Sequence, residues 1–271
     1  MLKARHRLRV AVLASHRAPG VSDLLADPLR GSLYELCGVL ASEEDFRDAA
    51  EIEAAGVPVV IHSYRRFCTR SRCRPGDLAA RREYDRQSAE ILAVFQPELV
   101  LLSGYLLILT RPMLSAYSNR IVNIHGSDLT ATSPSGAPLY PGLRAVEHAI
   151  FAGERETRAT AHRVTAEVDA GLPLLRSRAF PVSALAETAR ARGDARMLKA
   201  YAFAHQEWML HEAWGPLWKS VIRLSAAGRI EVGRMSAGPR RPLWSLSEHG
   251  GLLESNVAIP RPPFPAAPEA R

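Results

Sequence analysis

Two side chains that could perform acyl-transfer chemistry stand two residues apart at the end of one apolar stretch. Residues 121–129 read Ile-Val-Asn-Ile-His-Gly-Ser-Asp-Leu, a pattern typical of a buried strand that ends in a polar turn. Residues two apart on a strand point to the same face, so Asn123 and His125 should project side by side. An amide can stabilise a developing oxyanion and an imidazole can carry a proton. The pair predicts a catalytic site at the carboxyl end of this strand, where open α/β sheets bind their ligands.

The elements that must position this pair alternate between strands and helices in the first half of the chain. Apolar runs predict strands at 8–14, 36–41, 57–61, 99–102 and 121–124. Helical periodicity predicts helices at 43–55 and 77–95. This alternation indicates an α/β fold with a doubly wound, mostly parallel sheet.

The second half of the chain changes character after a Pro- and Gly-containing loop at 130–141. Helices are predicted at 143–151 and 194–213, and Gly215-Pro216 should break the second and start another helix that ends near Gly228. Strands are expected at 159–168 and 172–180, paired as a hairpin around Asp169-Ala170-Gly171. We predict an α/β domain over residues 1–229 that closes with this C-terminal helix. A Pro-rich extension without clear periodicity, partly disordered, should follow over 230–271.

Composition and charge limit the possible partners. The 271 residues carry a net charge of +7, which permits an anionic ligand such as a phosphate. Lys and Arg are scattered and form no nucleic-acid motif; we interpret the one dense basic run, 65–74, as a surface loop. No apolar run reaches the length of a membrane span. We therefore expect neither a nucleic acid nor a membrane as partner.

Cysteine usage and the N-terminus indicate the compartment. The chain has three cysteines, Cys37, Cys68 and Cys73, and no signal-peptide core follows its basic start. An odd cysteine count in such a chain suggests reduced thiols and a cytoplasmic protein. Cys68 and Cys73 have no second ligand pair, so no metal site is predicted.

Four ordered segments carry a family resemblance. They are Leu-Ser-Gly-Tyr-Leu-Leu-Ile-Leu at 102–109, Asn-Ile-His-Gly-Ser-Asp-Leu at 123–129, Tyr-Pro-Gly-Leu at 140–143 and Thr-Ala-His-Arg-Val-Thr-Ala-Glu-Val-Asp-Ala-Gly at 160–171. Together they resemble the folate-dependent formyltransferase family, in its glycinamide ribonucleotide transformylase-like branch. The resemblance implies the Rossmann-like formyltransferase fold and 10-formyltetrahydrofolate as co-substrate, without a metal.

The same resemblance implies a catalytic trio of Asn123, His125 and Asp169. In this family an amine attacks the formyl group of 10-formyltetrahydrofolate and a tetrahedral intermediate forms. Asn123 and His125 would donate hydrogen bonds to the oxyanion. Asp169 would pair with His125, favour its charged form and help to move the proton of the amine through water. His162, inside the matching block, is interpreted as structural or as a support of the trio.

Binding residues also follow from the resemblance. Those expected to contact the folate are Leu102, Gly104, Tyr105, Leu106, Leu107, Val164 and Val168. Those expected to contact the acceptor are Ser15, Arg17, Ser22, Tyr140 and Gly142. The partner is then a small-molecule amine, phosphorylated or not, and a homodimer is left open.

Departures from the family pattern leave the acceptor open. The turn after the first strand, Ala-Ser-His-Arg-Ala-Pro-Gly-Val-Ser-Asp at 14–23, lacks most glycines of the phosphate-binding loop, and Pro19 offers no amide hydrogen. Gly126 replaces a proline, and the loop before Tyr140 is longer. Phosphoribosylglycinamide, and with it purine biosynthesis, is the default acceptor, and another amine is the alternative.

Two further functions stay open. Hydrolysis of formyltetrahydrofolate uses water as acceptor, and the segment Ala-Thr-Ala-His at 159–162 is similar to the hydrolases of the family. A non-catalytic folate- or metabolite-binding protein could keep the trio by descent. Release of formyl with an amine, without an amine, or not at all distinguishes the three.

Overall fold

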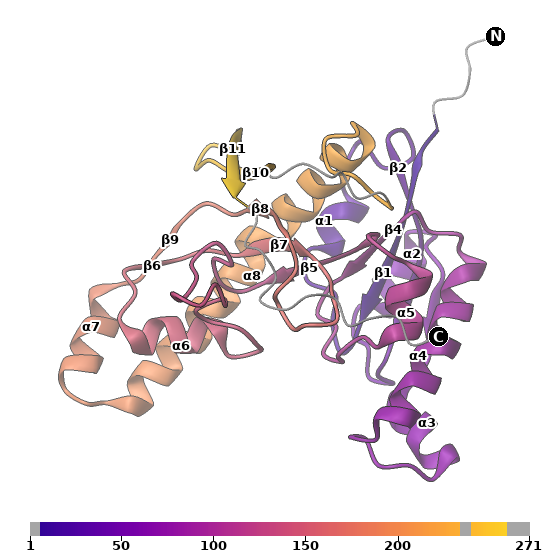
Figure 1. Ribbon diagram of the computed structural model, residues 1–271, viewed down its shortest axis with the longest axis horizontal. Coiled ribbons are helices and arrows are strands. Elements are labelled where there is room, and N and C mark those ends of the chain that lie inside the picture. Colours follow the sequence, from indigo (N-terminus) through magenta and orange to yellow (C-terminus); the bar gives the residue numbers. More distant parts are fainter. Residues whose placement is uncertain (1–5, 234–239, 259–271) are drawn as a thin grey trace.

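A nine-stranded sheet organises the molecule in the computed structural model, which describes residues 6–233 and 240–258 (Figure 1). The strand order is β11-β10-β8-β7-β5-β4-β1-β2-β3. The five strands from β3 to β5 are parallel, and β7 and β8 continue the sheet in antiparallel pairs. The parallel strands are β1 (Leu8–Ala14), β2 (Tyr34–Ala41), β3 (Val59–Ile61), β4 (Leu99–Leu102) and β5 (Ile121–His125). The others are β7 (Thr160–Arg163), β8 (Pro173–Arg176), β10 (Arg240–Leu246) and β11 (Leu252–Ala258).

Helices cover both faces of the parallel strands, which confirms the predicted doubly wound α/β fold. α4 and α5 lie on one side and α1 and α8 on the other (Figure 1). A small second sheet pairs β6 (Glu156–Thr157) with β9 (Phe180–Pro181). The helices are α1 (Val21–Leu25), α2 (Ala49–Ala54), α3 (Tyr64–Ser71), α4 (Leu78–Val94), α5 (Arg111–Ala116), α6 (Ala145–Ala152), α7 (Ala184–Ala191) and α8 (Ala195–Ala226).

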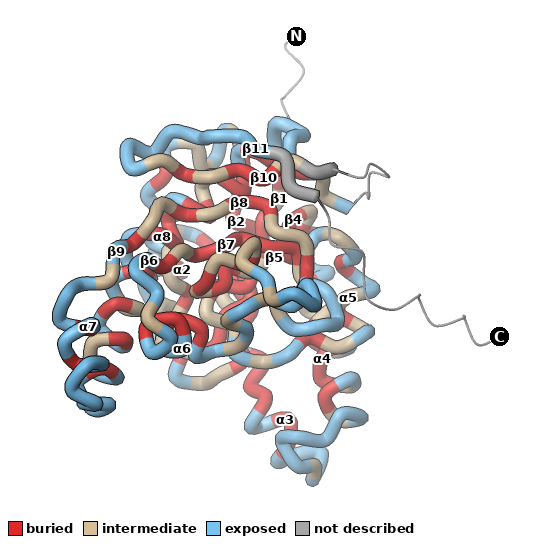
Figure 2. Tube along the Cα trace, turned by 60° about the vertical axis from the view of Figure 1, so that its left-hand side comes forward, coloured by how far each residue is buried: buried red, intermediate tan, exposed pale blue. Residues whose placement is uncertain are grey.

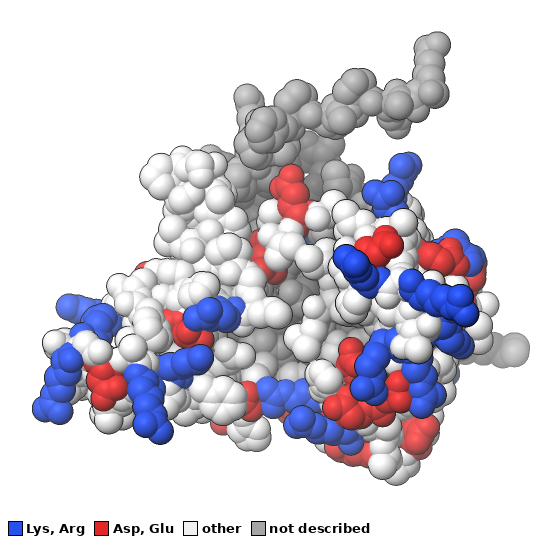
Figure 3. Space-filling view, turned by 90° about the horizontal axis from the view of Figure 1, so that it is seen from below, with Lys and Arg blue, Asp and Glu red and all other residues white. Residues whose placement is uncertain are grey.

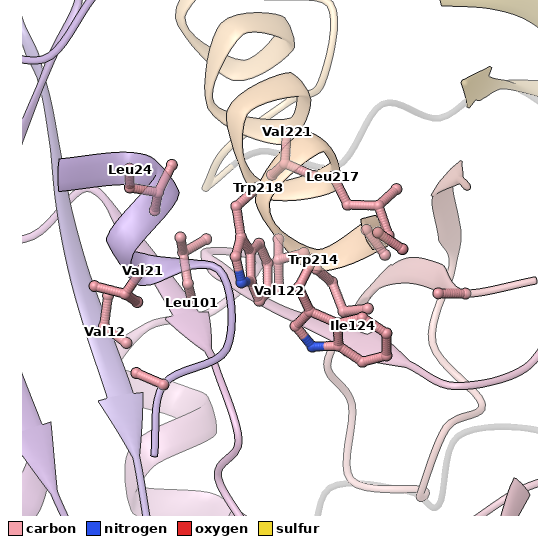
Figure 4. Close-up of a cluster of buried hydrophobic side chains, with 14 of the residues drawn as sticks. Val12, Val21, Leu24, Leu101, Val122, Ile124, Trp214, Leu217, Trp218 and Val221 are labelled. Atoms are coloured by element: carbon pink, nitrogen blue, oxygen red, sulfur yellow. The ribbon is translucent and has the colours of Figure 1, made fainter. Parts of the chain in front are cut away.

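The core consists of two apolar layers, one on each face of the sheet. Alternate residues of a strand point to opposite faces, so Val10 and Val12 enter one layer and Ala11 and Leu13 the other. In the first layer, strand residues meet side chains of α1 and α8, among them Trp214 (Figure 4). Figure 2 shows buried chain along the central strands. Packing on both faces makes the carboxyl ends of these strands a rigid base for a site.

Two predicted elements of the first half, the helix at 43–55 and the loop at 65–74, differ from those in the structure. The predicted helix 43–55 is helical only over Ala49–Ala54, because Asp45 and Asp48 bond to the turn after β1 instead of continuing a helix. The prediction that the basic run 65–74 forms a surface loop is wrong, since α3 occupies most of it. Ser63 caps α3, and Phe67 is buried against Tyr84.

Tertiary contacts also override predictions in the second half. The strand predicted for 159–168 ends at Arg163, and residues 164–172 form an irregular connection to β8. α8 passes through Gly215-Pro216 without a break. A Cβ at Gly215 would lie 2.3 Å from the Asp23 carboxyl carbon, so glycine there allows α1 to pack closely against the helix, and this packing outweighs the local propensity.

Two strands after residue 229 were not expected from the sequence. β10 pairs in parallel with β8, and β11 pairs antiparallel with β10. Leu243, Trp244 and Leu246 are buried there, and this burial supplies the stability that the weak periodicity does not indicate. The division of the chain at 229 stays a prediction, and the disorder expected for 259–271 lies outside the described residues. No helix in the described ranges is long and apolar enough to cross a membrane.

Candidate active site

Asn123, His125 and Asp169 converge at the carboxyl end of β5. β5 presents the first two residues, and the connection from β7 to β8 brings Asp169 to them. His125 Nδ1 lies 3.3 Å from Asp169 Oδ2, and the two side chains are 7% and 8% exposed. Since water is largely excluded, the attraction between an imidazolium and this carboxylate is weakly screened.

The backbone around Asp169 fixes its carboxylate. Asp169 has a φ of 55°, the left-handed region that Asp and Asn tolerate better than most residues. The Gly142 N–H donates to Asp169 Oδ2 at 2.8 Å. A Cβ at Gly171 would lie 1.6 Å from the Arg163 carbonyl oxygen, so the connection can turn this tightly only with glycine there. These contacts hold the carboxylate beside His125.

Both ring nitrogens of His125 face hydrogen-bond acceptors. Nε2 lies 2.7 Å from the Tyr140 carbonyl oxygen, and Nδ1 faces Asp169. The doubly protonated ring satisfies both acceptors. The Tyr140 carbonyl also accepts from Ser127 Oγ at 2.9 Å, so it keeps a donor if His125 turns away. The His125 ring is therefore placed to donate a hydrogen bond through Nε2.

His162 orients the Asn123 amide. The two residues are paired across β5 and β7, and Asn123 Nδ2 lies 3.1 Å from His162 Nε2. Burial lowers the pKa of His162 to about 4, and the attraction of Asp169 does not offset it, so the ring is neutral near pH 7. A neutral ring with its proton on Nδ1 donates to the Arg163 carbonyl at 3.0 Å and accepts from Asn123. One amide N–H of Asn123 is thereby held and the other is left for a ligand.

A cavity of about 430 Å³ opens in front of this trio, a size typical of small-molecule sites. It is lined by all seven residues predicted to contact the folate, Leu102, Gly104, Tyr105, Leu106, Leu107, Val164 and Val168, together with Asn123, His125, Gly142 and Asp169. Sequence reasoning missed Gln206, Leu210 and Trp214 of α8, which also line it. Their spacing of four residues places them on one helix face and was the available signal.

The residues 104–109 that line the cavity, and Thr110 after them, are anchored on α4. Arg81 Nε donates to the Ile108 carbonyl at 3.1 Å, and Arg81 Nη2 lies 2.6 Å from Asp85 Oδ1. Asp85 Oδ2 in turn accepts from the Thr110 N–H. Both charged residues are buried, so this pair fixes the position of the segment that lines the cavity.

Four of the predicted acceptor residues lie outside the cavity lining. Ser15 is buried and shares a hydrogen bond with Ser42 Oγ at 2.8 Å. Arg17 forms a two-pronged pair with Glu207. Ser22 is exposed on α1. Tyr140 contributes its carbonyl to His125, and its hydroxyl donates to Glu154 at 2.7 Å. Only Gly142 of the predicted acceptor set lines the cavity.

One group of possible metal ligands occurs within the described ranges. Ligand atoms of His16, Glu43 and Asp45 lie within 4.8 Å of one another, and His16 Nδ1 is 2.7 Å from Asp45 Oδ1. These side chains are partly or fully exposed and do not line the cavity. All three cysteines are free thiols.

Fold and site together define an α/β enzyme whose polar trio stands at the carboxyl edge of a doubly wound sheet. The sequence model of the formyl transferase family matches residues 8–201. The chain belongs to this family, as its sequence predicts, and the family uses formyltetrahydrofolate. Its similarity to a solved structure, glycinamide ribonucleotide transformylase 1 from Symbiobacterium toebii, covers 83% of this chain and 90% of that one, with 28% identity and a TM-score of 0.59.

Curated relatives include purine biosynthetic proteins and formyltetrahydrofolate deformylases. The chain is 28% identical over 182 residues, 66% of its length, to the trifunctional purine biosynthetic protein adenosine-3 of Drosophila melanogaster. It is 27% identical over 166 residues, 61% of its length, to the formyltetrahydrofolate deformylase of Escherichia coli K12. The chain spans 12% of the first protein and 51% of the second.

Proposed function

We propose that this chain transfers the formyl group of 10-formyltetrahydrofolate to a small primary amine. The observation that carries the proposal is the convergence of Asn123, His125 and Asp169 in a cavity lined by the segments predicted to contact the folate. The chain's membership of the formyl transferase family supplies the donor. The trio consists of an amide, an imidazole and a carboxylate. Acyl transfer needs only groups of this kind, which donate hydrogen bonds and move protons.

The proposed reaction begins when the amine nitrogen attacks the formyl carbon and the carbonyl electrons move to oxygen. The free N–H of Asn123 donates to the oxyanion. His125 Nε2–H turns from the Tyr140 carbonyl to the same oxyanion, and Ser127 keeps that carbonyl paired. The amine proton passes through water to Asp169. When the tetrahedral intermediate collapses, its bond to folate N10 breaks, and N10 takes a proton from His125 to leave as tetrahydrofolate. Asp169 then passes the proton it received to His125, which restores the starting pair.

Hydrolysis of formyltetrahydrofolate is the second candidate. Water then replaces the amine, and formate and tetrahydrofolate are the products. Two observations favour it: the segment Ala-Thr-Ala-His at 159–162, and the similarity to a formyltetrahydrofolate deformylase over 61% of the chain. The same trio serves both reactions, because both form an oxyanion at the formyl carbon.

The test is conversion of 10-formyltetrahydrofolate by the purified protein with and without a panel of primary amines. Conversion that requires an amine supports the transferase, and conversion without any amine supports the hydrolase. His125→Ala should abolish either conversion. His148→Ala is the matched control, because His148 is exposed on α6. Folate binding without conversion under any condition would contradict both candidates and leave a binding protein.

A further inference from the structure

We infer that the acceptor used by this chain carries no phosphate group, because carboxylates of the chain itself hold the Ala18 N–H and the Arg17 guanidinium of the turn between β1 and α1. The inference rests on the proposed function and specifies its substrate class. The turn comprises residues 15–20. The residues that determine this specificity are Asp48 and Glu207.

The turn lies where it can contact the end of the acceptor that is opposite the reacting amine. It follows β1, and β4 separates β1 from β5 in the parallel sheet. Neighbouring strands lie about 4.8 Å apart, so the turn stands roughly 10 Å along the sheet edge from the strand that carries His125. Of the turn, Pro19 lines the cavity, so the turn faces the part of the acceptor opposite its amine.

The Asp48 side chain accepts a hydrogen bond from a backbone N–H of the turn, a group that an anionic ligand would need. The Ala18 N–H donates to Asp48 Oδ2 at 2.6 Å, which is a short hydrogen bond. Asp48 is the N-cap residue of α2, and its side chain caps no backbone group of that helix. Its carboxylate serves the turn instead. A bound phosphate would have to displace this carboxylate or lie beside it.

Glu207 of α8 forms an ion pair with the guanidinium of Arg17, which belongs to the turn. Arg17 Nη1 and Nη2 donate to the two Glu207 oxygens at 2.9 and 2.7 Å. This hydrogen bonding raises the pKa of Arg17 and lowers the pKa of Glu207, so both groups are charged. A two-pronged pair satisfies the fork with which arginine binds phosphate. Arg17 therefore brings no free positive charge to the turn.

The rest of the turn is closed by packing. The Pro19 carbonyl accepts from Ser103 Oγ at 2.6 Å and from Trp218 Nε1 at 3.2 Å. Gly20 has a φ of 78°, and a Cβ there would lie 2.6 Å from the Gly215 nitrogen. α8 thus lies directly against the turn. The backbone has little room to rearrange into a loop that wraps a phosphate.

Acidic side chains near the turn also disfavour a bound phosphate. Asp23 is paired with Lys219, and Asp45 with His16, whereas the Asp48 carboxylate faces an uncharged backbone donor. Figure 3 shows Lys and Arg gathered mainly on the two outer parts of this face. A phosphate dianion at the turn would meet the Asp48 carboxylate and a Glu207 carboxylate that already holds Arg17. An uncharged or cationic acceptor avoids that repulsion.

A matched pair of acceptors tests the inference: glycinamide ribonucleotide and its dephosphorylated riboside, which differ only in the phosphate. Their binding to the full chain loaded with tetrahydrofolate is measured by calorimetry, which needs no turnover. Ribonucleotide binding equal to or weaker than riboside binding, including none, supports the inference. Ribonucleotide binding about tenfold tighter or more overturns it. Formyl loss from 10-formyltetrahydrofolate is followed separately, so a failure of the proposed function is recognised on its own.

Variants test the role assigned to the carboxylates. Asp48→Asn keeps an acceptor for the Ala18 N–H and removes the charge, and it should improve ribonucleotide binding relative to riboside binding by about tenfold. Asp48→Asn combined with Glu207→Gln should improve it further. Glu51→Gln is the control, because Glu51 is exposed on α2. An unchanged ratio in both Asp48 variants would refute the assignment.

Discussion

Asp169→Asn is the substitution that most sharply tests the charge of the trio. Asparagine has nearly the same shape, tolerates the left-handed backbone at this position, and can still accept from the Gly142 N–H. The change therefore removes one negative charge and leaves the connection between β7 and β8 in place.

The expected loss follows from the geometry of the pair. Two unit charges at the 3.3 Å between His125 Nδ1 and Asp169 Oδ2 attract by about 5 kcal/mol at an effective dielectric constant near 20. Desolvation of the buried carboxylate offsets part of this attraction. We therefore expect kcat/KM to fall by about 10²- to 10⁴-fold, since each tenfold change corresponds to about 1.4 kcal/mol.

The assay follows tetrahydrofolate release from 10-formyltetrahydrofolate by ultraviolet absorbance, with circular dichroism as the check on folding. Glu53→Gln is the control, because Glu53 is exposed on α2 and does not line the cavity. It should change kcat/KM by less than about threefold. An Asp169→Asn protein that folds and keeps more than a tenth of the wild-type kcat/KM would refute the role given to this carboxylate.

Three further predictions concern packing and pH. Gly171→Ala places a Cβ 1.6 Å from the Arg163 carbonyl oxygen, so it should lower the free energy of unfolding by at least about 3 kcal/mol in urea titrations. Trp218→Ala removes a fully buried ring and should cost about 3–5 kcal/mol, whereas Leu78→Ala, 68% exposed, should cost under about 0.5 kcal/mol; equal losses would contradict the core described here. Burial holds the pKa of His162 at about 4 in the folded chain, against 6.5 ordinarily, so between these pH values mainly the unfolded chain binds the proton. This residue should therefore lower the free energy of unfolding by up to roughly 1.4 kcal/mol per unit as pH falls from about 6.5 to 4, and His162→Gln should flatten that slope.

The sequence predicts the central sheet well because its strands are short apolar runs buried on both faces. The rule that alternate strand residues share a face is enough to place Asn123 beside His125. Asp169 is different, since it lies in an irregular connection without periodicity. Only the family resemblance joins it to the other two, and the structure shows that it lies near them.

What the sequence did not predict depends on contacts between distant segments. The Asp48 carboxylate reaches the Ala18 N–H across thirty positions of the chain, and no local pattern marks that bond. α8 continues through Gly215-Pro216 because α1 packs against it there. β10 and β11 join a sheet that already exists, so their stability comes from β8 and from each other rather than from their own sequence.

The central claim is that this cavity moves a formyl group from folate to an amine. It is tested most directly with 10-formyltetrahydrofolate labelled with ¹³C in the formyl carbon, an unphosphorylated primary amine, and nuclear magnetic resonance of the products. The account predicts the label on the amine as an N-formyl group, and no such product with the His125→Ala protein. Label found only in formate would favour the hydrolase, and label that stays on the folate would contradict catalysis by Asn123, His125 and Asp169 altogether.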